Sequence, residues 1–148
     1  MFRGVAQLNL DSKGRLAVPS RFHDAIAARC GGQLIVTADS DRCLLIYPLP
    51  DWEPIEQKLM SLSSFNAQIR ELQRRLVGYA ENVVMDATGR ILVPAALRRF
   101  AQLEKSVVLV GQGAKFELWN KDSWESRMEQ GGGFGPGGLP PELEGFSL

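Results

Sequence analysis

One segment of this sequence occurs twice, and this repetition constrains the fold more than any other feature. Residues 11–19 read DSKGRLAVP and residues 86–94 read DATGRILVP, 75 positions further along the chain. The similarity extends to both sides of the motif, where residues 8–10 match 83–85 and residues 34–36 match 108–110. A fixed spacing between similar segments indicates two copies of one structural unit. We therefore expect two halves with the same order of elements.

Each copy predicts a strand, a tight turn, a strand, a short helix, two strands and a helix that carries tryptophan. Gly14 and Gly89 can adopt a positive φ without steric cost. The preceding aspartates, Asp11 and Asp86, can accept hydrogen bonds from the backbone of the turn. These residues favour a short hairpin whose two strands pair with each other. Proline ends the second strand because it lacks the N–H that a strand ladder requires.

Caps and apolar runs predict the elements that follow the first turn. A helix is predicted over residues 21–29, with Ser20 as its cap and Gly31 and Gly32 as its stop. A turn is predicted over residues 111–113. The apolar runs predict strands over residues 33–37, 42–47, 107–110 and 115–119.

The repeats divide the chain into five segments. We expect a first module over residues 5–52, a helical insert over 53–80, a second module over 81–124, the end of a C-terminal helix over 125–130 and a flexible, acidic tail rich in glycine and proline over 131–148. The insert carries an apolar stripe of helical period, made of Phe65, Ile69, Leu72 and Leu76. Two interpretations of this stripe are open: the protein core, which we favour, and a seam for a partner helix.

Composition excludes several classes of protein. The chain has 148 residues, with 17 Lys+Arg against 17 Asp+Glu and 45% hydrophobic residues, as in an ordinary soluble globular protein. No apolar run approaches the roughly 20 residues that cross a bilayer, and the N-terminus lacks the apolar region of a secretory signal. Cys30 and Cys43 form no CxxC pair, so we expect buried, reduced thiols. These features predict a cytoplasmic protein with no membrane partner.

The sequence carries no signature of catalysis or of cofactor binding. His23 is the single histidine, and no nucleophile stands around it in a known motif, so we expect an ordinary helix-face residue. Residues 111–113 do not complete a GxGxxG fingerprint, because Phe116 occupies the place of the third glycine. Residue types that ligate metals do not cluster. We therefore expect no enzyme, no cofactor, no metal and no small-molecule substrate.

The duplicated turn is the remaining candidate site. Asp11 and Arg15 flank the first turn, so they can form an ion pair across the neck of the hairpin. Asp86 and Arg90 repeat this arrangement at the second turn. An exposed pair contributes only about 0 to 1 kcal/mol to stability. The pair either only specifies the loop or holds the arginine fork rigid for contacts with phosphate or guanine, and the residues alone leave both interpretations open.

The charge around the two turns favours function at the first. Residues 1–22 carry four basic residues and a single acid. Of these, Lys13 and Arg3 add positive charge near the first turn, whereas Ala87 and Thr88 occupy the second. A local basic patch can attract an anionic partner even when the net charge of the chain is zero.

The Asp-x-x-Gly-Arg-[Leu/Ile]-x-Val-Pro motif in both copies, the opening MFRG and the spacing between the copies resemble the MraZ family, over roughly residues 1–129. Its members carry two DxxxR motifs in tandem AbrB-like modules. The resemblance implies an α+β fold, a tandem-duplicated, swapped-hairpin β-barrel with pseudo-twofold symmetry and flanking helices.

The resemblance also implies a function. It predicts a sequence-specific, DNA-binding transcriptional regulator that acts in the nucleoid as a ring-shaped homo-oligomer. Its sites would be direct repeats upstream of the division and cell-wall gene cluster, including its own promoter. We expect Arg15, Lys13, Arg3 and Arg90 to contact double-stranded DNA, and Asp11, Gly14, Asp86 and Gly89 to orient the turns. The alternative is a ring-shaped scaffold that binds other proteins through the helical insert.

Overall fold

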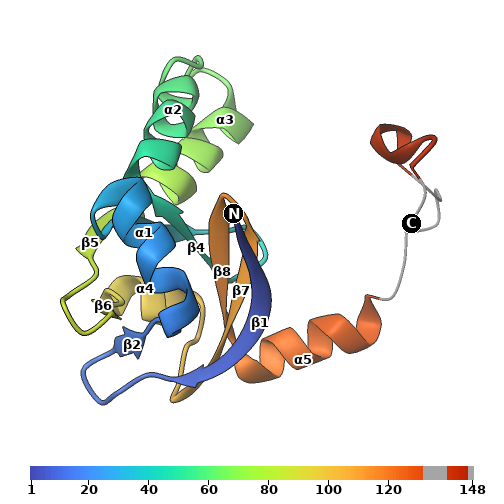
Figure 1. Ribbon diagram of the computed structural model, residues 1–148. Helices are drawn as coiled ribbons and strands as arrows, with labels where there is room; N and C mark the ends of the chain where they lie inside the picture. Colours follow the sequence, from blue (N-terminus) through green and yellow to red (C-terminus); the bar gives the residue numbers. More distant parts are fainter. Residues whose placement is uncertain (132–139, 147–148) are drawn as a thin grey trace.

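A computed structural model describes residues 1–131 and 140–146 and confirms the α+β class (Figure 1). Six strands form an antiparallel sheet in the order β1-β7-β8-β4-β3-β5, and β2 and β6 form a separate ribbon of two strands. The strands are β1 (Phe2–Asn9), β2 (Arg15–Ala17), β3 (Gln33–Ala38), β4 (Leu44–Pro48), β5 (Glu81–Val84), β6 (Arg90–Leu92), β7 (Ser106–Gly113) and β8 (Lys115–Asn120).

The helices lie between and beyond these strands. They are α1 (His23–Cys30), α2 (Leu49–Met60), α3 (Ala67–Leu72), α4 (Ala95–Phe100) and α5 (Lys121–Gln130), with 3₁₀ turns at Ser20–Phe22 and Pro141–Leu143 and a π-helical turn at Gln73–Val77. Within the described part of the chain, no helix combines the length and the apolar character needed to cross a bilayer.

Strand pairing crosses between the two repeats. β1 of the first repeat pairs along its whole length with β7 of the second, from Phe2↔Gly113 to Asn9↔Ser106. β5 of the second repeat pairs with β3 of the first, and β2 pairs with β6. The prediction that the strands around the first turn pair with each other is wrong beyond the single bridge Leu10↔Leu16. The three residues of β2 pair with β6 instead.

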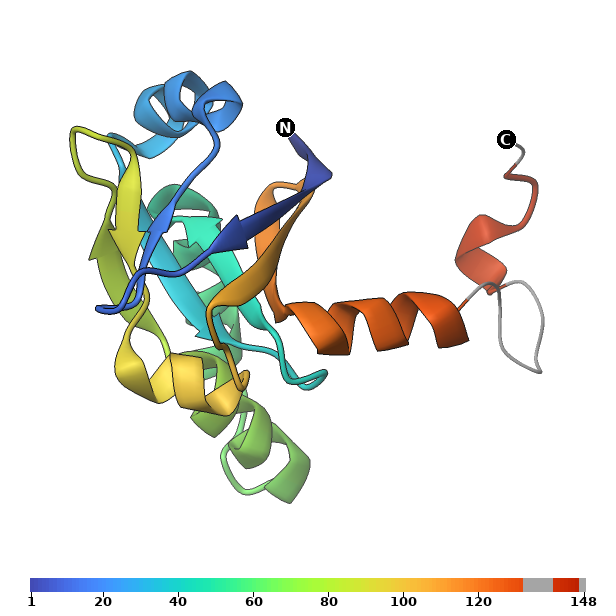
Figure 2. The same ribbon diagram turned by 90° about the horizontal axis from the view of Figure 1, so that it is seen from below.

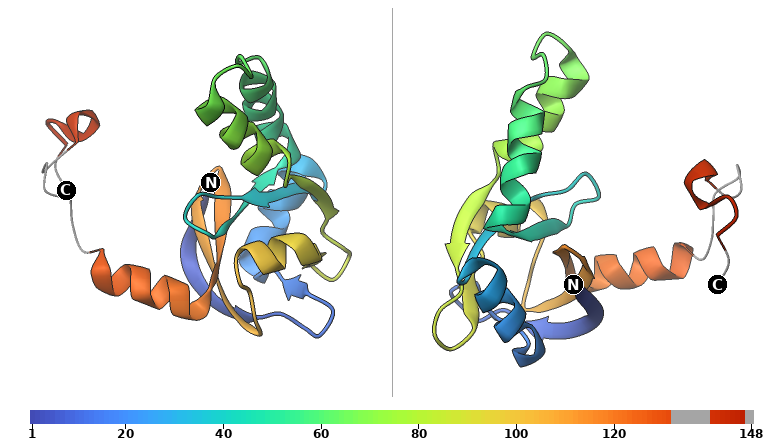
Figure 3. Two further views of the ribbon diagram at one scale, coloured as in Figure 1. Left: turned by 180° about the vertical axis from the view of Figure 1, so that it is seen from behind. Right: turned by 45° about the horizontal axis from the view of Figure 1, so that its top comes forward.

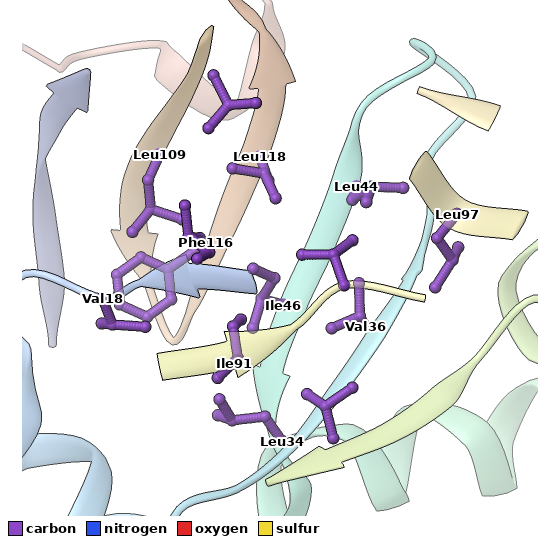
Figure 4. Close-up of a cluster of buried hydrophobic side chains, with 14 of the residues drawn as sticks. Val18, Leu34, Val36, Leu44, Ile46, Ile91, Leu97, Leu109, Phe116 and Leu118 are labelled. Carbon is purple, nitrogen blue, oxygen red and sulfur yellow. The ribbon is translucent and has the colours of Figure 1, made fainter. Parts of the chain in front are cut away.

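The sheet does not close into a barrel, which corrects the fold implied by the resemblance. β1 and β5 are its two edges, and the β2–β6 ribbon crosses one face together with α1 and α4. Ile91 of the ribbon and Leu97 of α4 point toward sheet residues such as Ile46 in Figure 4. The ribbon thus supplies the apolar cover that closure would otherwise provide. Each fully buried aliphatic side chain contributes about 1.5 to 3 kcal/mol of transfer free energy.

The opposite face of the sheet carries a smaller cluster beneath α5. Cys43, Val108, Val110 and Trp119 are buried there, and Trp124 of α5 packs on Trp119 with ring centroids 5.8 Å apart. Beyond this contact α5 projects away from the body, as Figure 2 shows. Both cysteines are free thiols, as expected, and Cys43 is buried whereas Cys30 is only half-buried.

Two local predictions were wrong for identifiable reasons. Ser20 does not cap a helix with its side chain, because residues 20–22 form a 3₁₀ turn and α1 begins at His23. The turn predicted over residues 111–113 is wrong, because β7 continues to Gly113. Gly111 is needed for a different reason, since a Cβ there would approach the backbone nitrogen of Arg3 on β1 to 2.5 Å. The stop predicted at Gly31 is confirmed, since its φ of 61° ends α1 in the left-handed region.

The helical insert stands out from the body at the end opposite the two motif turns (Figure 3). It is tied to the sheet where the hydroxyl of Thr37 donates a hydrogen bond of 2.6 Å to the carbonyl of Leu76. The core interpretation of the apolar stripe is wrong for Phe65, which is 95% exposed because α3 begins after it. Ile69, Leu72 and Leu76 are half-buried. The tail predicted to be flexible lies largely outside the described residues.

Candidate nucleic-acid interface

The first turn is organised by the carboxylate of Asp11. Its Oδ1 accepts hydrogen bonds of 2.9 Å from the backbone N–H groups of Lys13 and Arg15, and its Oδ2 accepts one of 2.7 Å from Nε of Arg15. Gly14 completes the turn with a φ of 87°. The backbone N–H of Arg15, followed by its guanidinium, lowers the pKa of Asp11 from 3.8 to about 2. Asp11 is therefore ionised at neutral pH and holds Arg15 in place.

The outer end of Arg15 is available for a ligand. The ion pair with Asp11 uses Nε, and Nη1 and Nη2 make no hydrogen bond with any residue that the structure describes. The side chain is 37% exposed. These two nitrogens are the edge of the guanidinium fork that makes parallel hydrogen bonds to a phosphate or to guanine.

The second turn has the same backbone with weaker charge. Oδ1 of Asp86 accepts hydrogen bonds of 2.9 Å from the N–H groups of Thr88 and Arg90, which corresponds to the pattern at the first turn. The hydroxyl of Thr88 accepts a hydrogen bond of 3.1 Å from Nε of Arg90. Nε of Arg90 and Oδ2 of Asp86 are therefore 3.5 Å apart, farther than the corresponding atoms of the first turn. The backbone N–H of Arg90 and the Thr88 hydroxyl lower the pKa of Asp86 to about 2. Thr88 takes the place of the cationic Lys13.

The β2–β6 ribbon brings the two turns to one region of the molecule. Val93 donates its N–H to the carbonyl of Gly14, and Val18 donates its N–H to the carbonyl of Gly89, each over 2.9 Å. The turns thus lie at opposite ends of the ribbon, separated by four residues of strand or about 13 Å. Both project on the side away from the insert (Figure 1).

Arg3 does not join this group. It pairs with Gln112 near the start of β1, whereas Asn9 at the other end leads into the first turn. Six residues of strand separate Arg3 from Asn9, or about 20 Å. The prediction that Arg3 adds charge beside the first turn is therefore wrong, because the strand carries the side chain to the far end of the sheet.

Two residues that the sequence did not assign to the site pack directly on the turns. Arg98 of α4 lies against Gly14, where an added Cβ would come within 2.6 Å of its Nε and Cζ. His23 of α1 occupies the equivalent place against Gly89. Arg98 donates from Nε to the carbonyl of Val93 over 3.0 Å, and Nε2 of His23 bonds the carbonyl of Val18 over 2.6 Å.

His23 is thus more than an ordinary helix-face residue, since it crosses to the turn of the other repeat. His23 and Arg98 are 75 positions apart, the same spacing as the motif residues. That spacing was the one signal in the sequence that links them. It could not reveal which turn each side chain contacts, because the contact depends on pairing between the repeats.

In the described part of the chain, no three side chains of His, Cys, Asp or Glu come together in a way that would hold a metal ion. The aspartates of the turns are instead engaged by N–H groups of their own loops. The chemistry of the turns is thus that of positively charged hydrogen-bond donors. Such donors suit an anionic partner.

Comparison with known proteins agrees with the duplication. The family model described as "MraZ protein, putative antitoxin-like" matches residues 1–75 and again residues 76–131. Proteins named Transcriptional regulator MraZ from Nitrosospira multiformis and Nitrosomonas eutropha are 63% and 59% identical over 148 residues, covering 100% of each chain. One of the same name from Pseudomonas aeruginosa is 50% identical over 151 residues, again with 100% coverage. The chain belongs to the MraZ family.

Proposed function

We propose that this protein is a transcriptional regulator that binds double-stranded DNA through its two motif turns. The observation that carries the proposal is the state of the Arg15 side chain, which is 37% exposed. Its Nε is held by Asp11, and its terminal nitrogens make no hydrogen bond with any residue that the structure describes. The names of the whole-length relatives support a regulator of transcription. Arg90 on the second turn and Lys13 on the first would add contacts.

The arrangement also supports a multivalent mode of binding. We infer that the protein forms a homo-oligomeric ring in the cytoplasm, associated with the nucleoid, and that the ring engages direct repeats upstream of the division and cell-wall gene cluster, including its own promoter. One pair of turns per subunit offers few contacts. A ring presents them repeatedly, and linked contacts raise the effective concentration for each subsequent contact. The pairing of β1 with β7 and of β5 with β3 supports hairpin exchange between two modules, the first ending near residue 52 and the second beginning near residue 81.

The test compares Arg15→Ala with a matched control, Arg74→Ala. Arg74 forms an exposed ion pair with Glu71 on the insert, remote from the turns. In fluorescence anisotropy with a labelled duplex from upstream of the gene, we expect Arg15→Ala to weaken binding by about 5- to 150-fold, since a bidentate arginine contact contributes about 1 to 3 kcal/mol. Arg74→Ala should bind like the unmodified protein. Equal affinities for the two variants would remove Arg15 from the interface.

A scaffold function is favoured by one observation, the exposed apolar tip of the insert. Phe65 is 95% exposed, and Met60 and Leu62 beside it are also exposed. Such a patch suits a protein partner. Affinity capture before and after nuclease treatment separates the two functions. Partners that persist without DNA and are lost in Phe65→Ser would favour the scaffold.

A further inference from the structure

The two turns share one backbone design but receive different side chains from the opposite repeat. At the first turn, Arg98 lies against Gly14, and the carbonyl of Lys105 accepts the N–H of Leu10 over 2.8 Å. At the second turn, the corresponding contacts are made by His23 and by Gly32, whose carbonyl accepts the N–H of Met85 over 2.8 Å.

Charge therefore differs at three equivalent places. Lys13, Arg98 and Lys105 surround the first turn, while Thr88, His23 and Gly32 take their places at the second. The backbone contacts are the same at the two turns, whereas lysine and arginine occupy these three places only at the first turn. A purely architectural role would not require this difference, because a neutral glycine and a threonine support the second turn with hydrogen bonds of the same length.

Two of these cations, Arg98 and Lys105, line a surface pocket of ≈ 520 Å³ beside the first turn. Its lining includes Asp11, Ser12, Gly14, Arg98, Glu104 and Lys105. The charge of Asp11 is engaged by Arg15 and two backbone N–H groups, so Glu104 is the one remaining acid among these lining residues. Arg98 and Lys105 come from the second repeat, and Asp11, Ser12 and Gly14 come from the first.

We propose that Arg98 and Lys105 of the second repeat complete an anion site beside the first turn, and that this pocket receives a backbone phosphate of the DNA that Arg15 contacts. This inference rests on the proposed function and makes the first turn the principal contact. Arg98 is held by the Val93 carbonyl through Nε, and its terminal nitrogens make no hydrogen bond with any other described residue. They are the donors that a phosphate oxygen accepts from.

The test counts phosphate contacts by salt titration of the full chain on duplex DNA. The slope of log affinity against log salt decreases by about 0.9 for each phosphate contact that is lost. We expect Arg98→Gln and Lys105→Gln each to reduce the slope by about that amount, and the double variant by about twice as much. Each single loss makes the fall in affinity between 50 and 200 mM salt about 3.5-fold smaller. His23→Gln, at the equivalent place on the second turn, should leave the slope unchanged.

Arg98→Lys separates charge from architecture. It keeps the cation but loses the guanidinium geometry at Val93, so we expect it to restore the slope that Arg98→Gln lowers. If Arg98 only supported the turn, Arg98→Gln and Arg98→Lys would have the same salt slope, and both would have the same lowered melting temperature. Competition with inorganic phosphate identifies the ligand. A variant that changes inhibition by phosphate without changing the slope on DNA would overturn the assignment to a DNA phosphate.

Different results would refute the proposed function and this inference. A chain that shows no salt-dependent affinity for duplex DNA would refute the proposed function itself. A chain that binds DNA with a steep slope, unchanged in Arg98→Gln and in Lys105→Gln, would leave the proposed function standing and refute this inference. Glu104→Gln tests separately whether the pocket binds an anion. Removal of this negative charge should raise the affinity for DNA at low salt.

Discussion

Gly14→Ala tests whether the first turn depends on contact between the repeats as well as on its own backbone. Gly14 has a φ of 87°, and a Cβ at this position would approach Nε and Cζ of Arg98 to 2.6 Å. The left-handed backbone alone costs an alanine about 1 to 2 kcal/mol. Arg98 is flexible enough to move aside, but it then loses its hydrogen bond to Val93, which contributes about 0.5 to 1.5 kcal/mol more.

The matched control is Gly113→Ala. Gly113 has a similar φ of 77°, and nothing lies within 4 Å of an added Cβ, so this variant has the backbone cost alone. We expect urea denaturation to show a loss of about 1.5 to 3.5 kcal/mol for Gly14→Ala and about 1 to 2 kcal/mol for Gly113→Ala. In a chain of this size the difference corresponds to about 2 to 4 °C in melting temperature per kcal/mol. Equal losses in the two variants would refute the steric contact with Arg98.

Two further predictions concern the ribbon and the acid limb of stability. Leu16→Ala should lower the free energy of unfolding, measured by urea denaturation, by about 2 to 5 kcal/mol, because Leu16 is 0% exposed. Leu92→Ala on the same ribbon should lower it little, because Leu92 is 53% exposed. The pKa values of Asp11 and Asp86 are lowered to about 2 on folding, so their contribution is present above pH 3.8 and lost as the pH falls toward 2. Between pH 5 and pH 2, the melting temperature of the Asp11→Asn, Asp86→Asn double variant should therefore fall less steeply with pH than that of the unmodified protein. The same pH dependence in both proteins would contradict the assignment.

The sequence predicted those features that are local to one repeat. Asp11 and Gly14 specify the first turn because the carboxylate accepts N–H groups within four residues and the glycine supplies a positive φ. Gly31 ends α1 for a similar reason. Such geometry needs no knowledge of the rest of the chain. The same reasoning applied to the second copy predicted the hydrogen bonds of Asp86 equally well.

Features that arise between the repeats were beyond the sequence. The alternating pattern of β2 is satisfied equally by pairing within its hairpin or with β6, so periodicity could not decide between them. Gly111 resembled a turn residue because the close approach of β1 was unknown. The contacts of Arg98 and His23 with the turns depend on that same crossing. DNA contact by Arg15, Lys13, Arg3 and Arg90 stays a prediction.

The crossed pairing also governs how the molecule is made. β1 leaves the ribosome before its partner β7, which follows about a hundred residues later. At a synthesis rate of about 5 to 20 residues per second, the N-terminal strand stays without its partner for roughly 5 to 20 s. Neither repeat can complete its share of the sheet alone, so we expect the two to fold in a single cooperative step. A polypeptide that contains one repeat alone would have to pair with strands of a second copy of itself to complete the sheet.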